Sequence, residues 1–195
     1  MLRLASRRHS GLALVLGALP NLPFARGSFD AVTANFVVNH TPDPRASIRE
    51  MRRVARPGGR IALTIWTGVV SPMNQLWNDV MAAAAVEPPP ARTLPPNKDF
   101  ERNAPGLAGI MTEADLTDVV VCEVHWLFRI SAVDLWRAAA GGIATFGQTY
   151  QAQQPLLRNR MRDAYTRLTH ERYSDGNLCL PSAALLATAA TETAA

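Results

Sequence analysis

The sequence has a single lysine, Lys98, and only two cysteines, Cys122 and Cys179, among its 195 residues. Its other basic residues are arginines scattered along the chain, so the formal net charge of +4 does not form a basic stripe. Nucleic acid is therefore not expected as a partner. The cysteines are far apart and lack metal-ligand spacing, which predicts buried free thiols and no metal site. No apolar run reaches the roughly 18 residues that a membrane-spanning helix needs.

The remaining composition is that of a globular protein, because 48% of the residues are hydrophobic and 18% are charged. The N-terminus allows two interpretations. Arg7-Arg8 followed by the apolar residues 11–17 imitates a twin-arginine or secretory signal. The other interpretation is the end of an amphipathic helix over residues 1–9, followed by a buried strand over residues 12–16. The short apolar stretch and the pattern downstream favour the second.

Strands and helices alternate in the first third of the chain. Residues 29–36 and 60–66 read as strands, with a helix over residues 45–55 between them that Asp43 can cap with Pro44 at its first position. Such an order indicates an α/β domain with a largely parallel sheet. Further elements are expected as helices over 73–86, 133–140 and 153–172, a proline-rich loop over 87–99, strands within 114–130 and over 178–187, and a frayed end over 188–195.

Three segments carry a resemblance to a known family. They are LPFARGSFDAV at residues 22–32, the pair Asn39-His40, and REMRRVARPGGR at residues 49–60. With these in register, residues 17–66 resemble the second half of a class I S-adenosylmethionine-dependent methyltransferase of the type-11, quinone-methylase-like group. Such enzymes begin with a strand, a glycine-rich turn and a helix. No G-x-G cluster stands before Gly17, so the resemblance implies that the chain starts inside the fold.

The resemblance therefore implies an α/β fold with an incomplete doubly wound, Rossmann-like methyltransferase sheet. That sheet would be mostly parallel, would lack the first two strands, and would end in an antiparallel C-terminal edge. We expect a single partial domain over residues 1–195. Residues 1–66 would be the remnant of the cofactor fold, and residues 67–195 would supply variable acceptor-side helices and the C-terminal strands.

The implied cofactor is S-adenosylmethionine. By resemblance, Ala18 and Leu19 would flank its adenine, although the family usually has an aspartate at Ala18, which could accept a hydrogen bond from the adenine amino group. Asn35 and Phe36, at the end of a strand, would face the methionine part of the cofactor and the acceptor. His40 is the candidate catalytic base. For each of these residues, ordinary structural packing is the alternative interpretation.

The function implied is methyl transfer to a small-molecule acceptor, impaired in this chain. Four tryptophans could line a pocket for a lipophilic or aromatic acceptor, or simply pack in the core. A non-catalytic remnant or partner subunit is the second hypothesis, and a nicotinamide-dependent enzyme is the third. We expect a cytoplasmic protein that self-associates through uncovered sheet surface. The four tryptophans that could line the acceptor pocket are Trp66, Trp77, Trp126 and Trp136.

Overall fold

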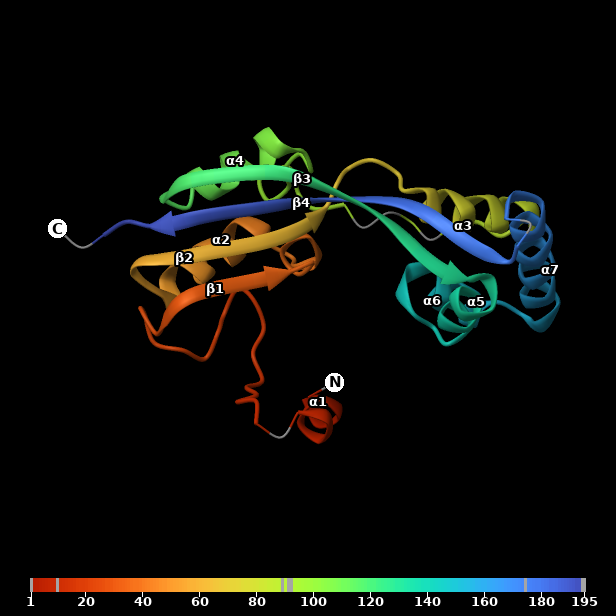
Figure 1. Cartoon of the computed structure of the whole chain (residues 1–195), viewed down its shortest axis with the longest axis horizontal. Helices are drawn as coiled ribbons and strands as arrows, with labels where there is room; N and C mark the ends of the chain where they lie inside the picture. The colour runs from red at the N-terminus through yellow and green to blue at the C-terminus, as the bar shows by residue number, and fades with distance from the viewer. Residues whose placement is uncertain (1, 10, 89, 91–92, 174, 194–195) are drawn as a thin grey trace. The chain divides into compact units, whose positions relative to one another are not determined.

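The computed structural model describes residues 2–9, 11–88, 90, 93–173 and 175–193. Both helices and strands form along this part of the chain, which Figure 1 traces in colour from the N-terminus to the C-terminus. In chain order they are α1 (Leu2–Arg8), β1 (Phe29–Asn35), the 3₁₀ helix η1 (Val38–His40), α2 (Pro44–Val54), β2 (Ala55–Trp66), α3 (Pro72–Ala83), α4 (Ala104–Thr112), β3 (Leu116–Ser131), α5 (Ala132–Ala140), α6 (Ala144–Ala152), α7 (Pro155–Arg172) and β4 (Asn177–Thr191).

The described residues pack into two compact units. The first comprises Met1–Gly68, Thr93–Glu123 and Ala184–Ala195, and the second comprises Val69–Arg92 and Val124–Ala183. Each unit has a hydrophobic core of its own. The expectation of one partial domain, divided near residue 66, stays a prediction.

The described strands form one open sheet in the order β1-β2-β4-β3. Strands β1 and β2 pair in parallel, with Asn35 opposite Thr64, and β4 pairs antiparallel with β2, with Ala184 opposite Trp66. The predicted α/β class, the parallel neighbours and the antiparallel C-terminal strand are thus confirmed. The parallel share of this mixed sheet is smaller than the sequence suggested, because β4 returns beside β2 in the opposite direction.

The core of the first unit follows the predicted periodicities. Ile61, Leu63 and Ile65 alternate toward the buried face of β2, as expected of a strand. Helix α2 buries Ile48 and Met51 among its apolar stripe, and it begins where predicted. At that start, Asp43 accepts a hydrogen bond of 2.9 Å from the amide of Ala46, and Pro44 occupies the first turn.

Strand β2 begins directly after α2, where the sequence predicts a turn, and its irregular start against β1 explains the glycine pair that follows Pro57. Gly58 has a φ of 71°, a conformation that favours glycine. A Cβ on Gly59 would lie 2.8 Å from the carbonyl oxygen of Arg56, so a side chain has no room there. The amide of Gly59 instead donates to Thr191 Oγ1 at 3.0 Å, which joins this irregular start of β2 to β4. The glycine pair therefore shapes the start of β2 and also anchors the C-terminal strand.

The second unit is mostly helical. Its core is filled by Leu76 and Val80 of α3 and by Met161 of α7, all almost fully buried. The predicted helices over 73–86, 133–140 and 153–172 appear as α3, α5 and α7. The described part of residues 87–99 holds no helix or strand, as expected. Helices α4 and α6 were not predicted, because glycines at 106, 109 and 147 interrupt their helical patterns.

The predicted buried strand over residues 12–16 is wrong. These residues form no strand, and their apolar side chains are exposed, with Leu12 at 60% and Leu16 at 83%. A strand needs a neighbour for its backbone hydrogen bonds, and within the described residues β1 pairs only with β2. The preceding helix α1 is present where predicted, but it buries no residue.

Two smaller expectations also differ from the structure. Cys122 is exposed and Cys179 is half-buried, so the prediction of buried thiols is wrong for Cys122. Cys122 follows Val121 on β3, and because side chains alternate along a strand, Val121 packs against the core while Cys122 points to the opposite, exposed face. Residues 188–191 belong to β4 rather than to a frayed end, whereas residues 194–195 lie outside the described residues. In the part of the chain that the structure describes, the helices are too short or too polar to cross a bilayer.

The N-cap of α2 provides a test of this fold. Replacing Asp43 by Ala removes the acceptor for the Ala46 amide and should lower the free energy of unfolding by about 1 kcal/mol. Asp43→Asn is the matched control, because it keeps the capping oxygen and removes only the carboxylate charge that lies 3.4 Å from Lys98 Nζ. Urea denaturation measures both. Equal losses in the two variants would show that the charge, not the cap, stabilises the helix.

Candidate functional site

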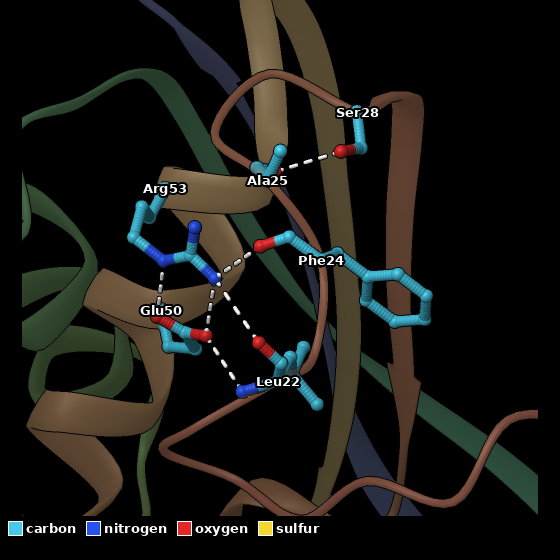
Figure 2. Close-up of polar contacts among 6 residues, drawn as sticks. All are labelled: Leu22, Phe24, Ala25, Ser28, Glu50 and Arg53. Carbon is cyan, nitrogen blue, oxygen red and sulfur yellow. Dashed lines mark hydrogen bonds and ion pairs between the residues drawn. The ribbon is translucent and has the colours of Figure 1, made fainter.

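The loop that precedes β1 is held against α2 by two side chains, as Figure 2 shows. Arg53 Nη2 donates to the carbonyl oxygens of Phe24 at 2.8 Å and Leu22 at 3.3 Å. Glu50 accepts two hydrogen bonds of 2.7 Å from Arg53, one from Nε to Oε2 and one from Nη2 to Oε1. Its Oε1 also accepts from the amide of Leu22 at 2.7 Å. We call these contacts the Glu50–Arg53 clamp. The clamp satisfies backbone groups of an irregular segment that has no regular partner.

The electrostatics of the clamp follow from its geometry. The Arg53 guanidinium beside Glu50, helped by the Leu22 amide, lowers the pKa of that carboxyl, against the opposing effect of partial burial. The Glu50 side chain is 11% exposed, so its charge is well shielded from water. The amide of Gly27 also donates to the carbonyl oxygen of Arg53 at 3.0 Å, so the same helix end fixes the loop just before β1 begins.

Ala18 and Leu19 lie in this clamped region. Leu19 is half-buried and packs against the core of the first unit, whereas Ala18 is exposed and forms an isolated antiparallel bridge with Asn21. Leu19 thus packs against the core, as the structural interpretation of this residue expects, and its place beside an adenine stays a prediction. No acidic residue precedes Asp30 in the sequence, so this loop carries no carboxylate of its own.

Polar groups gather where the parallel strands β1 and β2 end. Thr64 Oγ1 donates to Asn35 Oδ1 at 2.6 Å and accepts from the amide of Phe36 at 3.1 Å, so one hydroxyl joins both predicted residues. The carbonyl oxygen of Thr64 also accepts from the Phe36 amide at 3.1 Å. Since ligands of open α/β sheets bind beyond the carboxyl ends of parallel strands, this edge is the candidate site.

Phe36 has an unusual backbone and a defined ring position. Its φ is 53°, which is uncommon for a residue other than glycine and occurs most often at functional or strained positions. Its ring stacks on Trp66, with ring centroids 4.2 Å apart and an angle of 25° between the planes. The two rings form a flat apolar wall at the end of the parallel pair, and Trp66 stays 39% exposed.

Asn39 and His40 follow in η1. Asn39 Nδ2 lies 3.4 Å from His40 Nε2, and the His40 ring is exposed. Asn39 Oδ1 is buried without a hydrogen-bond partner in the structure. A buried acceptor without a partner loses the free energy of its hydration, so it is a natural position for a ligand that donates hydrogen bonds.

Hydrogen bonds from one side chain, that of Thr64, thus reach both Asn35 and Phe36. The Asn39–His40 pair lies on the following helix η1, and Ala18 and Leu19 lie on the loop before β1. Sequence reasoning missed Thr64, although its position opposite Asn35 follows once the two strands are aligned. The described residues contain no group of three His, Cys, Asp or Glu side chains suited to a metal ion.

The tryptophans divide between the two units. Trp66 borders the candidate site. Trp77 stacks on Phe146 with centroids 4.1 Å apart, and Trp136 lies 5.0 Å from the Tyr165 ring. Burial raises the pKa of Tyr165, whose hydroxyl donates to the Ala132 carbonyl oxygen at 2.8 Å. The aromatic residues of the second unit therefore serve in part as its core.

With this geometry established, comparison with known proteins is informative. The methyltransferase-domain family matches residues 1–63, the segment that contains the clamp, all of β1 and most of β2. The first third of this chain is therefore similar to a methyltransferase domain. The resemblance carried by residues 17–66 of the sequence is thereby confirmed.

Relatives of this chain cover it unequally. A demethylmenaquinone methyltransferase of Paenarthrobacter aurescens is 38% identical over 80 residues, which are 41% of this chain and 30% of that protein. One of Streptomyces avermitilis is 28% identical over 154 residues, 78% of this chain and 63% of that protein. The matches therefore cover less than two thirds of either relative.

The fold also agrees with a solved structure of this kind. The crystal structure of a candidate methyltransferase from Bacillus halodurans superposes with a TM-score of 0.54 at 14% identity. The alignment covers 98% of this chain and 79% of that one. At this level of identity the comparison supports the methyltransferase fold and carries no information on the acceptor.

The clamp supplies a prediction about stability and pH. Glu50→Leu leaves the Leu22 amide and the Arg53 guanidinium without their acceptor, and it should lower the free energy of unfolding by about 2 kcal/mol at pH 7. Glu50→Gln should lose less, because its amide oxygen still accepts from Leu22. Chemical denaturation of the three proteins measures the difference.

The pH dependence separates the charge of Glu50 from its shape. Because the folded-state pKa is lowered, the contribution of the carboxylate is complete above its ordinary value of 4.5 and disappears as pH falls through the lowered folded-state value. The stability gap between the natural chain and Glu50→Gln should therefore shrink as the pH falls below 4.5. A gap that stays constant down to pH 3 would show that the carboxylate charge contributes nothing.

Proposed function

We propose that this chain takes part in S-adenosylmethionine-dependent methyl transfer to a small-molecule acceptor. The observation that carries the proposal is the arrangement at the carboxyl ends of β1 and β2, where Thr64 holds Asn35 and Phe36 in place. In this family's fold type, that edge of the sheet is where a ligand binds. The family membership of residues 1–63 supports S-adenosylmethionine as the ligand.

The residues present fit one end of this cofactor better than the other. Asn39 Oδ1, buried and without a partner, suits the ammonium group of the methionine part. The Phe36–Trp66 wall offers apolar surface near it. At the nucleoside end, Leu19 offers apolar contact, but the Ala18 side chain accepts no hydrogen bond. Residues 1–29 also hold no carboxylate for the ribose hydroxyls.

The chemistry places modest demands on the protein. When bound, S-adenosylmethionine supplies an electrophilic methyl group. The chain would align the acceptor and exclude water, which in other enzymes provides much of the rate enhancement. We assign His40 as the base that takes the proton of an acceptor hydroxyl, because its exposed ring follows directly after the candidate site.

The names of the relatives support a lipophilic, aromatic acceptor, since both are demethylmenaquinone methyltransferases. We also propose a cytoplasmic location and self-association through apolar residues that the first unit leaves exposed. A second copy that covered them would remove apolar surface from water. The residues concerned are Leu12, Leu14, Val15 and Leu16.

The poor fit at the nucleoside end predicts impaired function for the 195-residue chain by itself. It also keeps a second candidate in place, a non-catalytic remnant or partner subunit that does not bind the cofactor alone. Binding distinguishes the two. Calorimetric titration with S-adenosylhomocysteine should give a Kd of about 0.1–1 mM, which corresponds to roughly −4 to −5.5 kcal/mol. Absence of binding at millimolar ligand would favour the non-catalytic candidate.

Asn39 provides the matched variants for this titration. Asn39→Leu removes the acceptor proposed for the ammonium group and should weaken binding about fivefold, or abolish it within the measurable range. Asn39→Asp places a carboxylate there and should preserve or strengthen binding through charge assistance. Equal affinities for all three chains, each checked for folding by circular dichroism, would remove Asn39 from the site.

A further inference from the structure

The first unit contains an open pocket of about 370 Å³ that is lined mainly by arginine side chains. Its walls come from α2, from the loop before β1 and from the residues that follow α4, all of which belong to this unit. None of the residues proposed to hold the cofactor lines it. The lining residues are Pro20, Asn21, Arg26, Ala46, Arg49, Glu50, Arg52, Arg53, Ala114 and Asp115.

Positive charge exceeds negative charge in this lining, which holds four guanidinium groups and two carboxylates. One carboxylate, Glu50, already accepts hydrogen bonds from Arg53 and from the Leu22 amide (Figure 2). Among the described residues, Arg26 and Arg49 form no ion pair, and both are exposed. The pocket therefore holds positive charge that its own acidic residues leave unbalanced, and an anion that enters it would gain Coulombic attraction.

Arg52 gives the second, independent sign of a missing partner. Its Nε is buried and has no hydrogen-bond partner among the described residues. Its Nη1 lies 3.7 Å from the Asp115 carboxylate, which is too long for a hydrogen bond, and the Asp115 side chain is 76% exposed. A buried guanidinium donor without an acceptor loses hydration that nothing in the protein replaces, so an oxygen of a ligand at this position would satisfy it.

The type of donor favours a tetrahedral oxyanion. A guanidinium presents its N–H groups in a fixed planar fork, which matches the geometry of phosphate oxygens. A phosphate monoester carries about −1.5 to −2 charge at pH 7, so it balances the excess more completely than a singly charged diester does. Two elements supply the charge, because Arg26 precedes β1, whereas Arg49 and Arg52 are neighbours on the surface of α2.

We propose that this pocket binds a doubly charged phosphate group, carried either by a soluble phosphate monoester or by the headgroup of a lipid. Arg49 and Arg52 would donate to the phosphate oxygens, with the buried Nε of Arg52 as one of the donors, and Arg26 would add charge from the loop. Because the pocket shares no residue with the proposed cofactor site, this assignment and the methyl-transfer function are tested separately.

Two soluble probes that differ in charge test the assignment on the full 195-residue chain. At pH 8, glycerol 3-phosphate is a doubly charged monoester, because its second pKa is about 6, whereas dimethyl phosphate is a singly charged diester. The titration is followed by nuclear magnetic resonance at constant ionic strength, using the Nε–Hε signal of Arg52 and the amide signals of the pocket.

Glycerol 3-phosphate should bind with a Kd of about 1 mM, and dimethyl phosphate should bind roughly fivefold more weakly. Equal affinities for the two probes would contradict the charge assigned to the ligand. Signals of Arg52 and of the pocket amides that do not move at about 20 mM glycerol 3-phosphate would overturn the proposal.

Charge-removing variants place the binding in the pocket. Arg49→Gln and Arg52→Gln should each weaken glycerol 3-phosphate about fivefold, because each removes one guanidinium from the lining. Arg60→Gln is the matched control, since it removes the same charge at an exposed position of β2 outside the lining, and it should bind as the natural chain does. Equal weakening by all three substitutions would show that net charge alone attracts the probe, which would overturn the assignment.

Asp115→Asn gives the opposite prediction. It removes the carboxylate that competes with the ligand for Arg52, so it should strengthen glycerol 3-phosphate binding about threefold. Asparagine has the same shape and tolerates the φ of 53° at this residue, so the variant should fold. Since unfolding cannot raise affinity, this variant decides the assignment even if Arg52→Gln is unstable. Unchanged or weaker binding would contradict the proposal.

Vesicles distinguish the two sources of the phosphate group. The chain is sedimented with phosphatidylcholine vesicles that contain either phosphatidic acid, a monoester lipid, or phosphatidylglycerol, a diester lipid. Preferential retention on phosphatidic acid that Arg52→Gln reduces would support the lipid headgroup. If glycerol 3-phosphate binds while vesicles retain nothing, or retain the natural chain and Arg52→Gln equally, the pocket does not take the lipid and the soluble monoester is supported.

Discussion

The first unit depends on how an irregular loop is fixed to a helix. The loop before β1 has few regular hydrogen bonds of its own, and the Glu50–Arg53 clamp supplies them from the last turns of α2. Because α2 also packs on the core through Ile48 and Met51, the clamp fixes the loop relative to the core. One guanidinium beside one shielded carboxylate thus holds the loop that leads into β1.

This constraint positions the candidate site at the other end of the same strand. Once the start of β1 is fixed, its parallel register with β2 places Asn35 opposite Thr64, and that hydroxyl then holds both Asn35 and the amide of Phe36. The positive φ of Phe36 turns the chain into η1, where Asn39 has its buried, unpaired oxygen. The site therefore results from strand register and one threonine more than from any single catalytic side chain.

Much of the fold could be predicted from the sequence because its signals are local. The alternation of Ile61, Leu63 and Ile65 and the Asp43-Pro44 cap each act within a few residues. The strand expected over residues 12–16 was wrong because apolar character alone does not supply a pairing partner. For the site, Asn35 and Phe36 follow from the end of a strand. The roles of Thr64 and of the clamp do not, because they depend on contacts 28 or more residues apart in sequence.

The central claim is that the carboxyl ends of β1 and β2 form the cofactor site. Its most direct test is a nuclear magnetic resonance titration of the isotopically labelled chain with S-adenosylhomocysteine. The account predicts that the amide signals of Phe36 and Asn39 shift progressively with ligand, together with those near Thr64, while signals of α7 stay unchanged. Shifts confined to the second unit, with Phe36 and Asn39 unaffected, would contradict it.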